Sequence, residues 1–178
     1  LYWKYSLKFN APLIPHYLSS YILNNSDRLM IASLVGDSSA AFYSVAYSVS
    51  SVVTIIWFAV NSSLVPYTYE KCEKKDYKSI SRITTPVLTI YAVACMLIVV
   101  VAPEIIHIMA TGSYHISIYV IPSIAGGMFF MALYYIFANI VYYYKKPKYV
   151  MAASVISAAL NLLLNWLFIP RYGFIAAG

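Results

Sequence analysis

The stretch Ile83–Val101 reads ITTPVLTIYAVACMLIVVV and contains no charged residue. The nearest charges on either side are Arg82 and Glu104. A helix needs about 20 predominantly apolar residues to cross the roughly 30 Å hydrocarbon core of a bilayer. Because backbone groups in lipid must find hydrogen-bond partners within their own segment, the stretch predicts a membrane-spanning helix.

Charge-free gaps of similar or greater length divide the rest of the chain. They lie between residues 8 and 27, 37 and 70, 104 and 145, and 148 and 171. The chain is 62% hydrophobic and only 10% charged, whereas a soluble domain has about 25% charged residues. The sequence therefore predicts an all-α, polytopic transmembrane helical bundle of about five complete spans plus the start of a sixth. We expect the spans at about residues 9–32, 41–69, 83–101, 117–144 and 149–169, with another starting at residue 174.

Both ends of the chain look cut. It begins with Leu1 instead of a methionine, and it ends in a new apolar run, Phe174–Ala177. We therefore expect a partial bundle, with further spans belonging to the same protein.

The basic residues sort to alternate connections of these spans. Short loops rich in Lys and Arg stay cytoplasmic, so the segment before the first span is predicted to lie inside. The net charge of +6 is explained by this topology and by contact with anionic lipid, and it gives no reason to expect nucleic acid as a partner. Only Arg28 and Arg171 depart from the pattern, and the other ten are Lys4, Lys8, Lys71, Lys74, Lys75, Lys78, Arg82, Lys145, Lys146 and Lys148.

The first span carries a polar stripe. At about 100° per residue, His16, Ser20, Asn24 and Asp27 fall within roughly 80° of one another, with Arg28 at the edge. Such a face should pack against other helices or line a water-filled cavity. Ionisable residues inside a membrane are candidates for function, so we expect these residues to line a substrate cavity.

A plainer explanation of the same stripe stays open. Asp27 and Arg28 could simply mark the membrane interface. His16 could donate to a backbone carbonyl that Pro12 or Pro15 leaves free.

Other spans add further candidates for the cavity and for hinges. Ser157, Asn161 and Asn165 repeat on one helical face, where they either join helices or line the cavity. The complete set of further cavity candidates is Asn61, Asn139, Asn161 and Asn165. The hinge candidates are Pro12, Pro15, Pro122, Gly126 and Gly127.

The sequence contains none of the motifs expected of common enzymes. There is no Gly-rich phosphate loop ending in Gly-Lys-Ser/Thr, no His-Glu-x-x-His metal site and no Gly-x-Ser-x-Gly elbow. No cofactor or metal is predicted, and the protein is not expected to be an enzyme. The classes of function that remain are transport and a structural role in the membrane.

The stretch Ala11–Ser50 resembles the start of the second half of Wzx-type polysaccharide flippases, such as O-antigen flippases. These belong to the multidrug/oligosaccharidyl-lipid/polysaccharide exporter superfamily. The resemblance rests on P-x-x-P-H-Y at Pro12–Tyr17, N-x-S-D-R at Asn24–Arg28 and G-D-S-x-A-A-x-Y-S-V-A-Y at Gly36–Tyr47. Similar strings follow in order at NSSLVPYTYEK (Asn61–Lys71), APEII (Ala102–Ile106), YYYKKPKY (Tyr142–Tyr149) and NLLLNWLFIPRYGFIAAG (Asn161–Gly178).

The resemblance implies a two-bundle, all-helical transporter of the bacterial inner membrane, of which this chain is most of the C-terminal bundle. Such proteins flip undecaprenyl-pyrophosphate-linked oligosaccharides between leaflets by alternating access, for lipopolysaccharide and other surface polysaccharides. Arg28 would match a cavity cation that attracts the pyrophosphate, with Asp27 beside it. The implied partners are the lipid-linked oligosaccharide, membrane lipid and the N-terminal half of the same protein. The alternatives are a MATE-like antiporter of small molecules and cations, or a non-transporting scaffold subunit.

Overall fold

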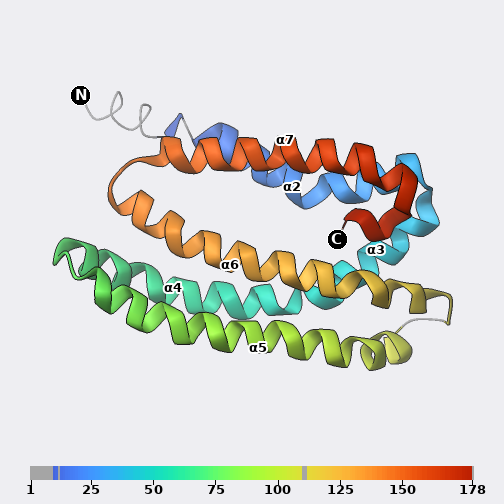
Figure 1. Ribbon diagram of the computed structural model, residues 1–178, viewed down its shortest axis with the longest axis horizontal. Helices are drawn as coiled ribbons and strands as arrows, with labels where there is room; N and C mark the ends of the chain where they lie inside the picture. The colour runs from blue at the N-terminus through green and yellow to red at the C-terminus, as the bar shows by residue number, and fades with distance from the viewer. Residues whose placement is uncertain (1–9, 12, 110–111, 178) are drawn as a thin grey trace.

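The computed structural model describes residues 10–11, 13–109 and 112–177 (Figure 1). The described part of the chain is helical throughout and contains no strand, which confirms the all-α class. Pro12, Lys4 and Lys8 lie outside the described residues, as does the expected start of the first span at residue 9. The elements are α2 (Leu13–Leu34), α3 (Asp37–Ser50), α4 (Val52–Glu73), α5 (Tyr77–Met109), the 3-10 helix η1 (Gly112–Val120), α6 (Ile121–Tyr143), α7 (Pro147–Tyr172) and the 3-10 helix η2 (Gly173–Ala177).

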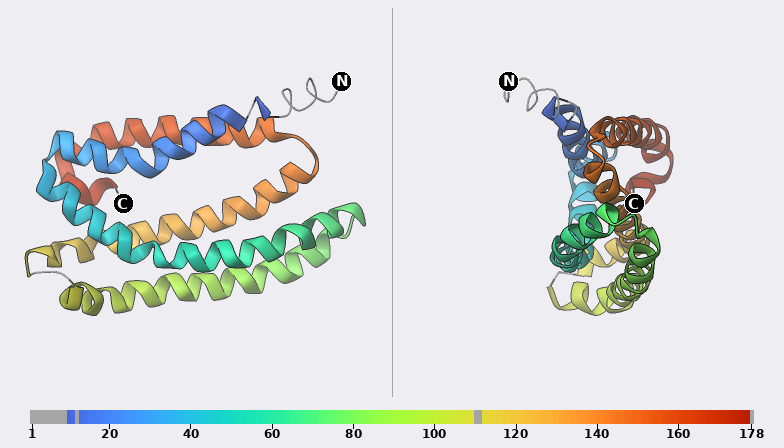
Figure 2. Two further views of the ribbon diagram at one scale, coloured as in Figure 1. Left: turned by 180° about the vertical axis from the view of Figure 1, so that it is seen from behind. Right: turned by 90° about the vertical axis from the view of Figure 1, so that its left-hand side faces the viewer.

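The helices form two groups that meet at one end (Figures 1 and 2). α2 packs along α7, and α4, α5 and α6 pack against one another as a second group. α3 crosses from the first group to the second, and η2 folds back from α7 to contact α3. The Tyr43 hydroxyl oxygen lies 3.3 Å from the Ala177 carbonyl oxygen across this contact. α3 and η2 therefore join the two groups at one end.

Within the described residues, four helical stretches are long and apolar enough to cross a membrane. They cover residues 37–73, 77–108, 112–143 and 147–177. α2 has 22 residues, which is enough for a span, but its polar stripe keeps it out of this set. α5 and α7 contain the expected spans 83–101 and 149–169 and extend beyond them by several residues. Two expectations stay predictions: α2 also crosses the membrane, and a further span starts at residue 174.

Ser51 divides the second expected span into two helices. The sequence predicts one helix over residues 41–69, but α3 ends at Ser50 and α4 begins at Val52, with a bend between them (Figure 1). Ser51 Oγ donates to a backbone carbonyl one turn earlier at 2.8 Å, and Thr54 Oγ1 donates to the Ser51 carbonyl at 2.5 Å. Hydroxyl groups that bond back to the helix backbone bend helices.

Pro122 lies in the first turn of α6, where 3-10 geometry changes to α-helical geometry. A proline is tolerated there because the first backbone N–H groups of a helix have no partner within the helix. The sequence predicts a kink within a span, and the structure instead places the proline at a boundary between two helices. Pro15 is the third residue of α2 and occupies the same kind of first-turn position. A hinge role for these prolines stays a prediction.

The α4–α5 and α6–α7 turns lie at the same end of the bundle and have the same design (Figure 1). Lys75 and Lys145 both have a positive φ, 55° and 53°. The residue after each lysine donates its backbone N–H to a carbonyl five residues back, at 2.9 and 3.2 Å. This pattern caps the C-terminus of a helix, and glycine is the residue that usually fills the left-handed position.

The basic residues of the described chain gather at this end, apart from Arg28 and Arg171, as the sequence predicts. Lys74 Nζ donates to Glu70 Oε1 at 2.6 Å, and this lysine holds the pKa of the Glu70 carboxyl below its usual value. Asp76 Oδ1 accepts from the Ser79 N–H at 3.2 Å and so caps the start of α5. The basic residues at this end are Lys71, Lys74, Lys75, Lys78, Arg82, Lys145, Lys146 and Lys148.

A polar pocket between α2, α6 and α7

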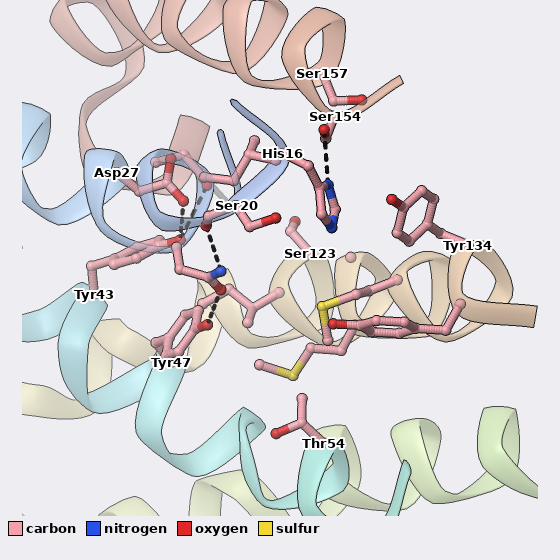
Figure 3. A pocket seen from close by; sticks show the side chains of 18 residues that line it. His16, Ser20, Asp27, Tyr43, Tyr47, Thr54, Ser123, Tyr134, Ser154 and Ser157 are labelled. Carbon is pink, nitrogen blue, oxygen red and sulfur yellow. Dashed lines mark hydrogen bonds between the residues drawn. The ribbon is translucent and has the colours of Figure 1, made fainter. Parts of the chain in front are cut away.

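A pocket of about 480 Å³ lies between the two groups of helices (Figure 3). This volume is within the range of about 300–1,000 Å³ found for small-molecule sites. Residues of α2, α3, α4, α6, α7 and η2 line it, so every described helix except α5 and η1 contributes. The bend at Ser51 and the fold-back of η2 bring Tyr43, Tyr47 and Ala177 to its lining.

The wall formed by α2 is polar. His16, Ser20, Asn24 and Asp27 all line the pocket, so the stripe identified in the sequence faces one shared space. α7 adds two hydroxyl groups to this wall, from Ser154 and Ser157, but Ser154 is largely buried. The structure thus brings the four residues to one pocket, and their role in binding a substrate stays a prediction.

The opposite wall, formed by α6, is largely apolar and aromatic. Ile124, Met128 and Met131 line it, together with Tyr134 and Tyr135. The Tyr134 hydroxyl oxygen is buried and has no hydrogen-bond partner among the described residues. A molecule in this pocket would meet hydroxyl, amide, imidazole and carboxylate groups on one side, and thioethers and aromatic rings on the other.

The Asp27 carboxylate is held by three neutral donors. Tyr43 Oη donates to Oδ2 at 3.0 Å, and Asn161 and Asn165 donate from Nδ2 to Oδ1 at 3.2 and 2.6 Å. Within the described residues, no basic side chain forms an ion pair with it. An ionised carboxylate accepts hydrogen bonds only, so these donors suit its charged form. The pocket thus contains a carboxylate whose charge no fixed cation balances.

Arg28 turns away from this carboxylate although it is the next residue. Its guanidinium lies over the Tyr47 ring, 4.6 Å from the centroid, and Tyr47 Oη donates to Asn24 Oδ1 at 3.2 Å. Arg28 does not line the pocket, and its Nε is buried with no hydrogen-bond partner within the described residues. The sequence placed Arg28 at the edge of the stripe, and the structure puts an aromatic ring between it and the pocket.

Ser157, Asn161 and Asn165 lie along one face of α7 and are called the Asn ladder below. The ladder serves both purposes that the sequence left open, lining the pocket and joining helices. Ser157 lines the pocket, as an element of a cavity wall would. Asn161 and Asn165 instead join α7 to α2, because they bond to Asp27 and because Asn161 Oδ1 accepts from Ser26 Oγ at 3.0 Å. Asn165 is 3% exposed and does not line the pocket.

Two other candidates from the sequence lie elsewhere in the bundle. Asn139 Nδ2 donates to Asn61 Oδ1 at 2.9 Å and joins α6 to α4. Neither residue lines the pocket. Of the glycine pair in α6, Gly127 lines the pocket and Gly126 does not, and neither would bring an added Cβ within 4 Å of another residue. Their role as a hinge stays a prediction.

His16 is fixed by a contact with α7. Its Nδ1 lies 3.0 Å from Ser154 Oγ, and Ser154 Oγ donates to the Met151 carbonyl at 2.9 Å. The sequence suggested a backbone carbonyl freed by a proline as the partner, and the structure supplies a hydroxyl group on another helix.

Several lining residues were not identified in the sequence. Tyr43 and Tyr47 occur one turn apart, but their abundance among 19 tyrosines hides them. Ser154 precedes the Asn ladder by a helical repeat, so the ladder could have been extended to it. The remaining lining residues that the sequence analysis missed are Leu23, Thr54, Ser123, Ile124, Met128, Met131, Tyr134, Tyr135 and Ala177.

Comparison with known proteins places this bundle in a family. A protein of the Lsg locus of Haemophilus influenzae is 26% identical over 86% of this chain and 39% of its own length. A protein of Haloferax volcanii named as the probable low-salt glycan biosynthesis flippase Agl15 is 24% identical over 90% of this chain and 35% of its own length. The chain thus spans well under half of these relatives, and no solved structure matches it.

The MatE family model matches residues 12–167, which is most of the chain and includes all of α2 through α6 and most of α7. This match agrees with the resemblance seen in the sequence strings and with the all-helical, apolar structure. The chain therefore belongs to the MatE family of membrane transporters, within the multidrug/oligosaccharidyl-lipid/polysaccharide exporter superfamily.

Proposed function

We propose that this chain forms one bundle of a flippase that moves undecaprenyl-pyrophosphate-linked oligosaccharides across a bacterial inner membrane for the synthesis of surface polysaccharide. The observation that carries this proposal is the two-sided pocket. Hydroxyl, amide and carboxylate groups on α2 and α7 suit the hydroxyl groups of a sugar, and Tyr134 and Tyr135 offer ring faces opposite them. The name of the Haloferax volcanii relative, a glycan biosynthesis flippase, supports the same substrate class.

The size of the pocket limits what it can hold. A volume of about 480 Å³ suits a ligand of drug-like size, so part of the oligosaccharide would enter while the lipid stays outside. The rest of the substrate would lie against a second bundle. The relatives support this division, because the chain spans only 35–39% of their length. On this proposal the N-terminal half of the same protein supplies the remaining cavity residues and the cations that attract the pyrophosphate.

Asp27 is the proposed link between transport and an ion gradient. Its carboxylate is tied to two amides of α7, and a proton or a cation on the carboxylate would weaken those bonds. Because α2 and α7 pack along each other, such a change would bias how the two helices sit. A charge without a fixed counter-ion inside the membrane is expected to be retained for function.

The gathering of basic residues at the α4–α5 and α6–α7 turns supports a cytoplasmic position for that end of the bundle. The N-terminal end of α2 lies at the same end (Figure 1). We therefore propose a multi-pass protein of the inner membrane, with the N-terminal end of this chain on the cytoplasmic side.

Transport of a small lipophilic cation is the second candidate function. It is favoured by the thioethers and aromatic rings of Met128, Met131 and Tyr135 facing the unpaired carboxylate of Asp27. Cations are attracted to aromatic faces and to carboxylates, so the same pocket has the right chemistry for an antiporter.

Deletion of the gene separates these functions. If the protein is a flippase, deletion should make lipid-linked oligosaccharide accumulate on the inner leaflet and should abolish surface polysaccharide, and the wild-type gene should reverse both effects. If it is an antiporter, deletion should leave the polysaccharide unaltered and increase the sensitivity of the cells to lipophilic cations. Unaltered surface polysaccharide would exclude the flippase.

A further inference from the structure

The hydrogen bonds around His16 determine which of its ring nitrogens carries the proton. A serine hydroxyl has one proton to donate, and Ser154 Oγ donates it to the Met151 carbonyl at 2.9 Å. Toward His16 Nδ1, 3.0 Å away, Ser154 Oγ can therefore only accept. Nδ1 must then be the protonated nitrogen of the neutral ring, and Nε2 keeps its lone pair.

Nε2 faces the pocket. Figure 3 shows the imidazole attached through Nδ1 to Ser154 on α7, with its other nitrogen directed toward α6. The Tyr134 hydroxyl points from α6 toward the same ring (Figure 3). That hydroxyl oxygen is buried and has no partner among the described residues. On one wall of the pocket, His16 Nε2 can accept a hydrogen bond. On the other wall, the Tyr134 phenol has no partner among the described residues.

A hydroxyl group has the chemistry to satisfy both of these groups. It donates its proton to the Nε2 lone pair and accepts the proton of the Tyr134 phenol, whereas a purely anionic group could use only the phenol. This requirement agrees with a sugar, the substrate class of the proposed function on which the inference rests. We infer that His16 Nε2 and Tyr134 bind one substrate hydroxyl, and that a proton and this hydroxyl compete for Nε2.

The competition between the proton and the substrate hydroxyl determines in which direction each is moved across the membrane. A neutral His16 binds the sugar when the pocket opens to the cytoplasm, and a proton taken up from the more acidic external side displaces it. Linkage requires the reverse as well, so that sugar binding expels the proton. Each substrate moved outward would then be exchanged for a proton moved inward, which follows the proton gradient of an energised cell.

The other ionisable groups around this pocket are few. Asp27 lies eleven positions along α2, roughly 16 Å at 1.5 Å per residue, so its carboxylate is not a direct partner of the ring. α7 contributes only hydroxyl groups to the lining. The remaining ionisable groups facing the ring or the pocket are tyrosines: Tyr17 on α2, in contact with the ring; Tyr43 and Tyr47 on α3; and Tyr134 and Tyr135 on α6.

Proton release on binding tests the competition directly. The probe is the lipid-linked oligosaccharide extracted from cells that lack the gene, added to the full-length transporter in weakly buffered nanodiscs near pH 6. The wild type is expected to release up to one proton for each molecule bound. Its affinity should fall by up to tenfold for each pH unit once the pH is low enough to protonate His16 in the free transporter. Proton uptake instead of release would overturn the inference, because it would mean that an imidazolium binds an anion.

His16→Gln is the informative variant. Its amide oxygen can still accept from a hydroxyl but cannot be protonated, so binding should persist with no proton release and no dependence on pH. Exposed histidines outside the pocket provide matched controls, and His107→Gln and His115→Gln should release protons as the wild type does. Tyr134→Phe should weaken binding severalfold and leave proton release unchanged. Proton release that persists in His16→Gln would refute the role of His16.

The tautomer can be measured on the wild type even if a variant fails to fold. Nitrogen-15 NMR of labelled histidine at neutral pH should show His16 protonated at Nδ1 and unprotonated at Nε2, and the opposite tautomer would refute the inference. If the wild type binds the extracted substrate without releasing a proton, only this inference fails. If it binds none at any pH, the flippase function fails and the inference fails with it.

Discussion

Asn165 Nδ2 donates to Asp27 Oδ1 at 2.6 Å, and this bond joins the interior of α7 to the polar face of α2. Asn165 is almost completely buried, whereas Asp27 borders the pocket. Hydrogen bonds to an ionised group are shorter and stronger than those between neutral groups. The pair thus makes the charge that faces the pocket part of the contact between two helices.

Asp27→Asn is expected to abolish transport while leaving the protein folded. The amide keeps the shape of the carboxylate and can still accept from Asn165, but it has no charge to bind a proton or cation. We expect more than about a tenfold loss of transport, equivalent to at least about 1.4 kcal/mol. Export of polysaccharide in complemented deletion cells, normalised to membrane protein level, measures this. A fall in protein level that matches the fall in export would assign Asp27 a structural role only.

Asn165→Ala is expected to reduce stability. It removes a donor to a carboxylate, an interaction worth about 1.5–3 kcal/mol in soluble proteins and about 0.6–1.7 kcal/mol for hydrogen bonds between membrane helices. Asn25→Ala is the matched control, because among the described residues Asn25 Nδ2 bonds within its own helix, to the Tyr21 carbonyl at 2.8 Å. Thermal unfolding in detergent should show a clear loss for Asn165→Ala and little change for Asn25→Ala. Equal effects would show that the bond between α2 and α7 does not stabilise the protein.

Asn61 and Asn139 are expected to stabilise the α4–α6 contact instead of binding substrate. They bond to each other at 2.9 Å and lie outside the pocket. A double-mutant cycle with alanine at both positions should give a coupling energy of about 0.6 kcal/mol and no more than about 1.7 kcal/mol. Each single variant should retain transport when corrected for protein level. Additive effects on stability, or a selective loss of transport, would contradict this assignment.

Lys75→Gly and Lys145→Gly are expected to stabilise the two turns. Both lysines adopt positive φ, a conformation that costs a residue with a side chain roughly 1–2 kcal/mol and glycine much less. Part of the gain is offset by the entropy of glycine in the unfolded chain, so a net gain of up to about 1 kcal/mol is expected. Lys74→Gly is the control, because Lys74 has φ −80° and should lose stability. The midpoints of thermal unfolding of the three variants decide the matter.

The general plan of the bundle could be predicted from the sequence because it depends on simple repeating properties. Gaps between charges mark where lipid must be crossed, and the basic residues sort by the side of the membrane. The face shared by His16, Ser20, Asn24 and Asp27 follows from the helical period alone, and the structure places all four in one pocket. These features are local, so no knowledge of the packing is needed.

Features that depend on the partner helix could not be predicted. The division of the Asn ladder arises because the side chains of Asn161 and Asn165 reach Asp27 on α2, whereas Ser157 lines the pocket. The displacement of Arg28 from the pocket depends on Tyr47, which comes from a helix that the sequence joined to α4. The break at Ser51 follows from hydroxyl groups bonding to the backbone, which many unbroken membrane helices also contain.

Flipping by the purified protein tests the central proposal most directly. The full-length transporter would be reconstituted in liposomes whose inner leaflet holds the lipid-linked oligosaccharide extracted from deletion cells. Access of an external glycosidase to the sugar then reports its arrival in the outer leaflet. We expect a proton gradient, acidic on the side that receives the sugar, to speed its appearance with the wild type, and we expect little sugar to appear with Asp27→Asn whether or not the gradient is present. Sugar that stays as inaccessible with the wild type as in protein-free liposomes would contradict it.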